Sequence, residues 1–189
     1  MLFRSPVYHG TPYTWLHPEV RRLSQARVPA EQRARVLVIM GGADPKNRTQ
    51  EAIEWLNRLG VREIDVVVGP ANKFGQEIRQ AMENIGSQAR CLENISEARS
   101  ALARARFAIC AFGISAYECY SLGTPVLLAT HEKSDRRDAE AFLNRMPHAG
   151  VFWDPSANFI PEFRNFPDPS LGNQLGHLAE NLGKILRSI

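Results

Sequence analysis

The sequence contains no long hydrophobic run and no targeting segment at its start. Among its 189 residues, no stretch approaches the roughly 20 apolar residues that a membrane-spanning helix needs. The opening residues, Met1 to Pro6, lack the apolar core of a secretory signal peptide. We therefore expect a cytoplasmic protein without a membrane span.

Excess charge of one sign and paired cysteines are also missing. The net charge is only +3 at pH 7, and no block of Lys and Arg is interleaved with aromatic residues, so nothing indicates a nucleic-acid partner. Three cysteines, Cys91, Cys110 and Cys119, form no C-x-x-C pair, and we expect small buried thiols in a reducing compartment. The five histidines have no metal-ligand spacing, so we predict no metal site.

Three common catalytic or cofactor-binding motifs are absent. The glycines at Gly41 and Gly42 do not continue into G-x-G-x-x-G, which argues against a dinucleotide fingerprint. The phosphate-loop pattern G-x-x-x-x-G-K-[ST] does not occur, which argues against a P-loop NTPase. Ser115 lies outside any G-x-S-x-G elbow, so a serine hydrolase is disfavoured.

What the sequence does contain is a regular alternation of short apolar runs and helical patterns. The predicted strands are 35–40, 64–69, 89–92, 107–111, 125–130 and 151–153, and the predicted helices between them are 49–59, 74–84, 95–105, 115–122 and 136–146. We expect Gly60 and Gly123 to end helices, and Asn94 or Ser96 to cap one. This alternation predicts an α/β, Rossmann-like open parallel sheet with helices on both faces.

The chain divides into two parts. Residues 1–34 carry four of the twelve prolines and no clear apolar period, and we interpret them as an N-terminal arm or interdomain-like segment with a possible helix at 18–25. Residues 35–189 are predicted to form one ligand-binding domain that closes with a helix over 171–186.

Ligands of open parallel sheets bind beyond the carboxyl ends of the strands. The candidate binding loops are therefore 41–48, 69–73, 92–96, 112–117 and 130–136. In the first loop, Gly41, Gly42 and Asp44 either approach a ligand or simply make a tight turn. In the second, Gly69 precedes Asn72, which either bonds a sugar hydroxyl or stabilises the turn.

The most informative stretch runs from Ile109 to Leu128. It predicts a buried strand, a turn of small residues, a helix start and a Gly-Thr-Pro break into another strand. The new helix presents free backbone N–H groups and the positive end of its dipole, which suits a diphosphate. Glu118 follows about one turn later, where a carboxylate reaches a ribose diol or merely complements the dipole. The predicted contacts in this stretch are Gly113, Ile114, Ser115, Ala116 and Glu118.

His131 is the one histidine at a predicted carboxyl-end loop. With Glu132 and Asp135 nearby, it is a candidate for acid–base chemistry or for holding a sugar. The alternative is a solvated loop histidine. No other residue stands out as catalytic.

The order and spacing of these motifs resemble one family. The residues that carry the resemblance are Gly41-Gly42-Ala-Asp44-Pro-Lys-Asn47, Val68-Gly69-Pro-Ala-Asn72, Glu93-Asn94-Ile95, Ala111-Phe-Gly113-Ile-Ser115-Ala-Tyr117-Glu118 and Leu122-Gly123-Thr-Pro125. The chain resembles, over about residues 8–153, the C-terminal half of the pseudaminic-acid-pathway UDP-sugar hydrolases and the related spore-coat polysaccharide proteins. These families are grouped with the peptidoglycan N-acetylglucosaminyltransferases in the GT-B superfamily.

The resemblance implies a nucleotide-sugar site with UDP or a UDP-sugar as ligand and no further cofactor. It implies that the Gly113–Ala116 turn holds the diphosphate, that Glu118 takes the ribose hydroxyls, and that Asn94 and Ile95 lie against the uracil. The turns at Gly41-Gly42 and Asn72 would line the same cleft.

The chain also departs from the family. Phe112-Gly113-Ile114-Ser115 stands where the family has Gly-Gly-Ser-Thr, which narrows the expected phosphate loop, and His131 to Asp135 replaces an Asp-Asn-Gln run. None of the 189 residues resembles the family's N-terminal domain with its catalytic histidine, so we expect that domain to be supplied separately. Three hypotheses follow: a split glycosyltransferase or UDP-sugar hydrolase completed by a separate N-terminal-domain chain or a second copy, a binding module without turnover, or a scaffold for protein contacts. Phe112, Tyr117 and residues 1–18 are the expected partner contacts.

Overall fold

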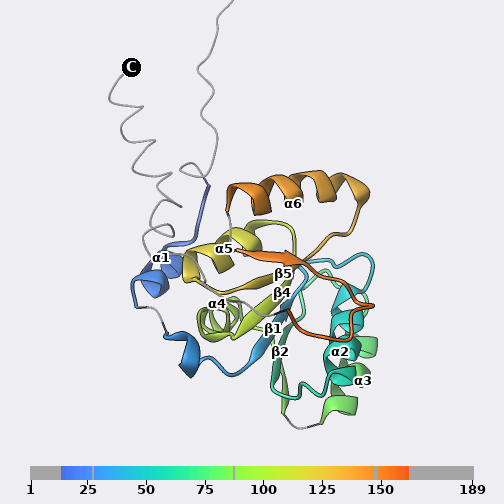
Figure 1. The fold of residues 1–189 in the computed structure, drawn as a ribbon. Helices are drawn as coiled ribbons and strands as arrows, with labels where there is room; N and C mark the ends of the chain where they lie inside the picture. Colours follow the sequence, from blue (N-terminus) through green and yellow to red (C-terminus); the bar gives the residue numbers. More distant parts are fainter. Residues whose placement is uncertain (1–13, 27, 87, 147–148, 162–189) are drawn as a thin grey trace, which may run out of the picture.

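One open parallel sheet organises the molecule (Figure 1). The computed structural model describes residues 14–26, 28–86, 88–146 and 149–161. Within these ranges six strands pair in the order β3-β2-β1-β4-β5-β6, and every pairing is parallel. The strands are β1 (Val36–Ile39), β2 (Ile64–Val67), β3 (Ala89–Leu92), β4 (Phe107–Ala111), β5 (Val126–Ala129) and β6 (Gly150–Phe152). The predicted α/β, Rossmann-like fold class is confirmed.

The helices cover both faces of this sheet. In Figure 1, α2 (Arg48–Arg58) and α3 (Gly75–Ile85) lie on one side, and α1 (Pro18–Gln25), α4 (Ile95–Arg104) and α5 (Ile114–Leu122) lie on the other. The remaining elements of the described residues are α6 (Lys133–Arg145) and a short 3-10 turn, η2 (Ala30–Gln32). The predicted helices are confirmed except for the helix expected over 171–186, which lies outside the described residues.

The start of α6 was predicted three residues too late. The helix begins at Lys133 because Glu132 and Asp135 form a capping box, in which each side chain accepts a hydrogen bond from the other residue's backbone N–H. The prediction followed the apolar residues of the helix, and those begin further along the chain.

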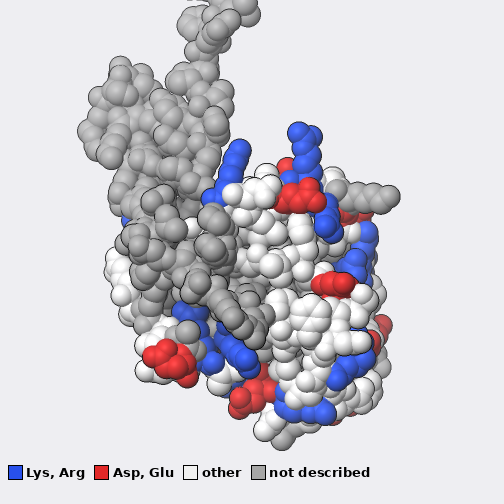
Figure 2. Space-filling model, viewed as in Figure 1, with Lys and Arg blue, Asp and Glu red and all other residues white. Residues whose placement is uncertain are grey.

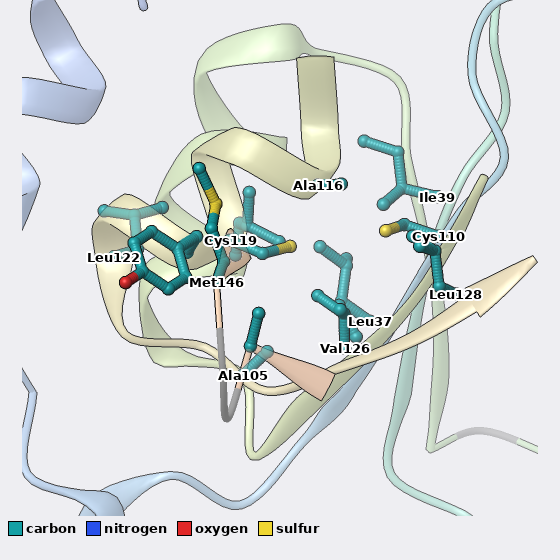
Figure 3. Packing of buried hydrophobic residues seen from close by; sticks show 14 of the residues in the cluster. Leu37, Ile39, Ala105, Cys110, Ala116, Cys119, Leu122, Val126, Leu128 and Met146 are labelled. Atoms are coloured by element: carbon teal, nitrogen blue, oxygen red, sulfur yellow. The ribbon is translucent and has the colours of Figure 1, made fainter. Parts of the chain in front are cut away.

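Alternating strand residues build a separate core on each face. In β1, Leu37 and Ile39 point toward α5, whereas Val36 and Val38 pack toward α2 and α3. Figure 3 shows the first core, where Ala116, Cys119 and Leu122 of α5 face side chains of β1, β4 and β5. This packing fixes α5 over the centre of the sheet, directly after β4.

The segment before β1 is packed onto the domain where the structure describes it. The helix predicted at 18–25 is confirmed as α1; Pro18 begins it, and His17 Nδ1 accepts a hydrogen bond from the Glu19 N–H at 3.2 Å. Leu16 and Val20 are buried in the core cluster of α5. Arg33 donates hydrogen bonds to the carbonyls of Gly123, at 2.7 Å, and Leu122, at 3.2 Å, at the end of α5. The division at residue 34 stays a prediction.

The helix ends and two of the three cysteines follow the predictions. Gly60 and Gly123 adopt positive φ angles, +75° and +66°, just past α2 and α5. Cys110 and Cys119 are free and buried, whereas Cys91, on the edge strand β3, is exposed, so the expectation of burial is wrong there.

Two findings concern the outside of the molecule. Over the described residues, no helix combines the length and apolarity that crossing a membrane requires. The face drawn in Figure 2 carries basic and acidic side chains interspersed.

Candidate functional site

The order in which successive strands are added to the sheet reverses between β1 and β4. From β1 the chain continues to β2 and β3 on one side, and from β4 to β5 and β6 on the other. The carboxyl ends of β1 and β4 are adjacent, because Ile39 pairs with Cys110. This is the switch point at which open α/β sheets bind ligands. The predicted loops 41–48 and 112–117 therefore meet here.

The loop after β1 is closed by Asp44. Its carboxylate, in a residue that is 1% exposed, accepts hydrogen bonds from the backbone N–H groups of Arg48 and Thr49, both at 2.8 Å. Asp44 itself has a φ of +43°, in the left-handed region. This candidate site residue thus caps α2, and both of its oxygens are engaged in that task.

Gly69 and Asn72 shape the neighbouring loop. A Cβ on Gly69 would lie 2.4 Å from the Gly42 carbonyl oxygen, so only glycine lets the two loops approach this closely. The Ala71 N–H donates to the same Gly42 oxygen at 3.1 Å. Asn72 Oδ1 accepts from the Phe74 N–H at 2.7 Å, which is the turn-stabilising alternative for that residue.

Asn94 and Ile95 open α4 at the end of β3. Asn94 Oδ1 accepts a hydrogen bond from the Ser96 N–H at 2.8 Å, so the predicted cap is confirmed. Ile95, the first helical residue, is 60% exposed. An apolar side chain of this size at a helix start offers a surface for a flat ring.

The N-terminus of α5 carries no cap. Among the described residues no side chain caps it, and its first turn contains no acidic residue. The Ala116 N–H donates to the Gly113 carbonyl at 3.1 Å, whereas the N–H groups of Ile114 and Ser115 have no acceptor in the described part of the chain. Two backbone donors and the positive end of the dipole are therefore free for an anion.

Phe112 does not crowd this turn. Its half-buried ring packs against Phe142 of α6 and Tyr117 of α5, with centroid distances of 5.9 and 6.4 Å. Phe112 and Tyr117, expected as partner contacts, both belong to this aromatic cluster and stay partly buried, and the partner contact stays a prediction. Ile114 is the larger side chain that remains at the mouth of the turn, 46% exposed.

Glu118 is the most unusual side chain near this turn. The residue is 8% exposed, and no hydrogen bond within the described residues reaches its carboxylate. Among the described residues, its charged neighbour is Arg99 of α4, whose Nε lies 3.9 Å from Oε1. Burial raises the pKa of the Glu118 carboxyl, and the Arg99 guanidinium partly opposes that rise. Neither of its oxygens is both fully buried and without a partner in the described residues, and an acceptor that no described donor engages suits a bound hydroxyl.

His131 points its ring nitrogens into the protein. Nε2 lies 3.4 Å from the Met40 carbonyl oxygen, and Nδ1 lies 3.9 Å from Asp44 Oδ1, buried without a hydrogen bond. Beside it, Glu132 pairs with Lys46 at 3.0 Å. A hollow of about 650 Å³ at this edge joins the loops after β1 and β5; it is lined by Lys46, Arg48, Thr130, His131, Glu132, Ser134 and Arg136.

Sequence reasoning missed Arg99. The signal was present, because α4 and α5 both begin with Ile-Ser and both place a charged residue at their fifth position, Arg99 and Glu118. Since equivalent positions of two packed helices that start at the same edge lie at similar depth, the two were candidates for a pair.

Comparison with known proteins gives one distant sequence relationship. An α/β chain with an uncapped helix at the switch point is, as a class, suited to binding an anionic ligand. No family model matches the sequence. The chain is 25% identical over 142 residues to the spore coat polysaccharide biosynthesis protein SpsG of Bacillus subtilis (strain 168). The match covers 74% of this chain and 42% of that protein, so this chain spans less than half the length of its relative. The two are distantly related.

Proposed function

We propose that this chain is the UDP-sugar-binding half of a GT-B-type glycosyltransferase or UDP-sugar hydrolase that acts in surface polysaccharide or nonulosonate biosynthesis. The distant relationship to a spore coat polysaccharide biosynthesis protein supports the pathway class. The parallel sheet with its switch point at β1 and β4 supports nucleotide binding. The cytoplasmic location expected from the sequence belongs to the same proposal.

The observation that carries the proposal is the pairing, within the described residues, of an uncapped helix terminus with a largely buried carboxylate that accepts no hydrogen bond. The N–H groups of Ile114 and Ser115 offer donors for a diphosphate. Glu118, one turn further along the same helix, offers only acceptors, which suits the two hydroxyl donors of a ribose diol. A nucleoside diphosphate carries both groups a short distance apart.

The other candidate residues take places around this pair. Asn94 and Ile95 lie at the start of the neighbouring helix, where the exposed Ile95 suits the uracil face. Gly41 and Gly42 border the switch point from the β1 side, and the sugar lies toward them and the hollow beside His131. Catalysis depends on an N-terminal domain from a separate chain or a second copy of this one.

Calorimetric and thermal-shift titrations with UDP, next to GDP and AMP, test the proposal. We expect UDP to bind the wild type with a dissociation constant of about 0.1–1 mM, because a half-site buries only part of its ligand. Glu118→Ala removes the acceptor of both hydroxyls and lowers the affinity at least tenfold, since hydrogen bonds to charged groups are worth about 1.5–3 kcal/mol. Glu77→Ala, which removes an exposed glutamate from α3, is the matched control and leaves the affinity unchanged.

The outcomes separate the hypotheses. Binding that is lost in Glu118→Ala supports the nucleotide site. Turnover of a UDP-sugar after a partner chain is added distinguishes a split enzyme from a binding module. Absence of any shift at millimolar UDP refutes the proposal and favours the scaffold hypothesis.

A further inference from the structure

Arg99 lies between two carboxylates that come from different helices. Its Nη1 is 3.3 Å from Glu19 Oε2 of α1, and its Nε is 3.9 Å from Glu118 Oε1 of α5. All three side chains are largely buried, with exposed fractions of 15% for Arg99, 19% for Glu19 and 11% for Glu118. One guanidinium therefore serves two acids at the place where α1, α4 and α5 meet.

The two contacts differ in kind. Glu19 is held firmly, because its other oxygen accepts a hydrogen bond from Ser96 Oγ at 2.6 Å. The contact with Glu118 is electrostatic, since 3.9 Å is too long for a hydrogen bond. The Arg99 Nε is buried and has no hydrogen-bond partner, although it faces the Glu118 carboxylate. Arg99 is thus anchored on the α1 side and leaves the lone pairs of Glu118 unoccupied.

An ionised carboxylate in this position needs a counter-charge. Taking a carboxylate out of water is costly unless a cation accompanies it. A cation that bonded Glu118 tightly would occupy the lone pairs that a ligand needs. Arg99, near but not bonded, supplies the charge without taking the acceptor sites.

We propose that Arg99 is the positioning residue of this site: held by Glu19 of α1, it keeps the Glu118 carboxylate ionised and oriented to accept the hydroxyls of a nucleotide ribose. The inference rests on the proposed function and extends it, because it makes α1 part of the binding site. Arg99 touches the ligand nowhere and acts through Glu118.

Paired titrations with UDP and 2′,3′-dideoxy-UDP test this role. In Arg99→Met we expect the UDP affinity to fall about tenfold and the dideoxy-UDP affinity to change less than twofold, because only UDP uses Glu118. Arg99→Lys retains the positive charge and recovers part of the UDP affinity. Arg104→Met, at the exposed end of the same helix, is the control and changes neither affinity.

A second readout needs no nucleotide. In the part of the chain that the structure describes, the charged groups that face Glu118 are Arg99 from α4 and, beyond it, Glu19 from α1, while the Cys119 thiol lies buried beside it on α5. Carbon-13 carboxyl NMR should therefore show the Glu118 titration midpoint rising in Arg99→Met relative to wild type and staying unchanged in Arg104→Met.

The nucleotide titrations and the Glu118 titration midpoint together support or overturn the role of Arg99. Loss of UDP affinity alone, together with a raised Glu118 midpoint, supports the inference. An equal loss for both nucleotides shows a purely structural role and overturns it, as does an unchanged midpoint. Absence of UDP binding to the wild type removes the proposed function and the ribose role together, and the midpoint still reports whether Arg99 controls the charge of Glu118.

Discussion

Two helices begin at the switch point of the sheet, and their N-termini differ in one respect. At α2, the carboxylate of Asp44 accepts hydrogen bonds from the Arg48 and Thr49 N–H groups. At α5, no side chain of the described residues fills the corresponding place, and the N–H groups of Ile114 and Ser115 find no acceptor there. Both helices follow a glycine-containing turn, yet only α5 keeps the donors that an anion requires.

The contrast between α2 and α5 shows that a glycine turn before a helix does not by itself identify a binding site. The protein stabilises α2 internally and leaves α5 dependent on packing, through Ala116, Cys119 and Leu122 against the sheet. An uncapped helix terminus lowers the stability of the fold. Such a terminus is retained chiefly where it binds a ligand.

Removing the cap of α2 should have the largest effect on stability. Asp44→Ala deletes two hydrogen bonds to a charged acceptor and places alanine at a left-handed φ, so we expect a loss of about 2 kcal/mol. For a domain of this size the melting temperature falls by roughly 4–8 °C. Differential scanning calorimetry measures this change.

The same variant tests the assignment of Asp44. If Asp44 only caps α2, the UDP affinity of the folded variant stays within about threefold of the wild type. Asp44→Asn, which keeps an acceptor and tolerates the left-handed conformation, loses less stability. A large loss of affinity in Asp44→Asn without loss of stability would instead identify Asp44 as a ligand contact.

A capping side chain added at the start of α5 should block the proposed anion site. Gly113 has an extended backbone, and a Cβ there meets nothing within 4 Å, so Gly113→Asp is accommodated. Its carboxylate occupies the free N–H groups and repels a diphosphate, and we expect at least a tenfold loss of UDP affinity. Stability should rise by about 0.3–1 kcal/mol, since an acid at a helix start complements the dipole.

Two neighbouring variants separate charge from bulk. Gly113→Ala adds a methyl group without an acceptor and keeps most of the affinity, whereas Gly113→Ser supplies a neutral cap and gives an intermediate result. Unchanged UDP binding in Gly113→Asp would place the diphosphate away from α5. Isothermal titration calorimetry on the three variants decides between these outcomes.

The sequence predicted more of the fold than of the site, for a physical reason. Strand identity followed from short apolar runs, and helix ends followed from Gly60 and Gly123, because these signals act within a few residues. The role of Asp44 as a cap of α2 depends on how the loop after β1 folds back onto the helix start. The charge environment of Glu118 depends on how α4 packs on α5 and α1, which no local pattern records.

The smallest effect that we expect is the contribution of Glu118 in α5 to the pH dependence of stability. Burial raises the pKa of Glu118 above its ordinary value of 4.5 in the folded protein, so ionisation of this group opposes folding. The penalty is absent below the unfolded pKa, where both states are protonated, and grows as the pH rises through the folded pKa. Glu118→Gln should therefore be more stable than wild type at pH 7 and nearly equal to it at pH 4.

Urea unfolding of Glu118→Gln at both pH values measures this difference. Glu77→Gln makes the same substitution at an exposed glutamate of α3 and is measured beside it as the control. A Gln variant that is less stable than wild type at pH 7 would mean that Arg99 stabilises Glu118 more than burial destabilises it. In that case Glu118 resembles Asp44, a group that the fold itself satisfies, and the contrast between the two helix starts disappears. If Glu118→Gln is stabilised and no longer binds UDP, the ionised Glu118 carboxylate lowers the stability of the fold and is needed for binding the ligand.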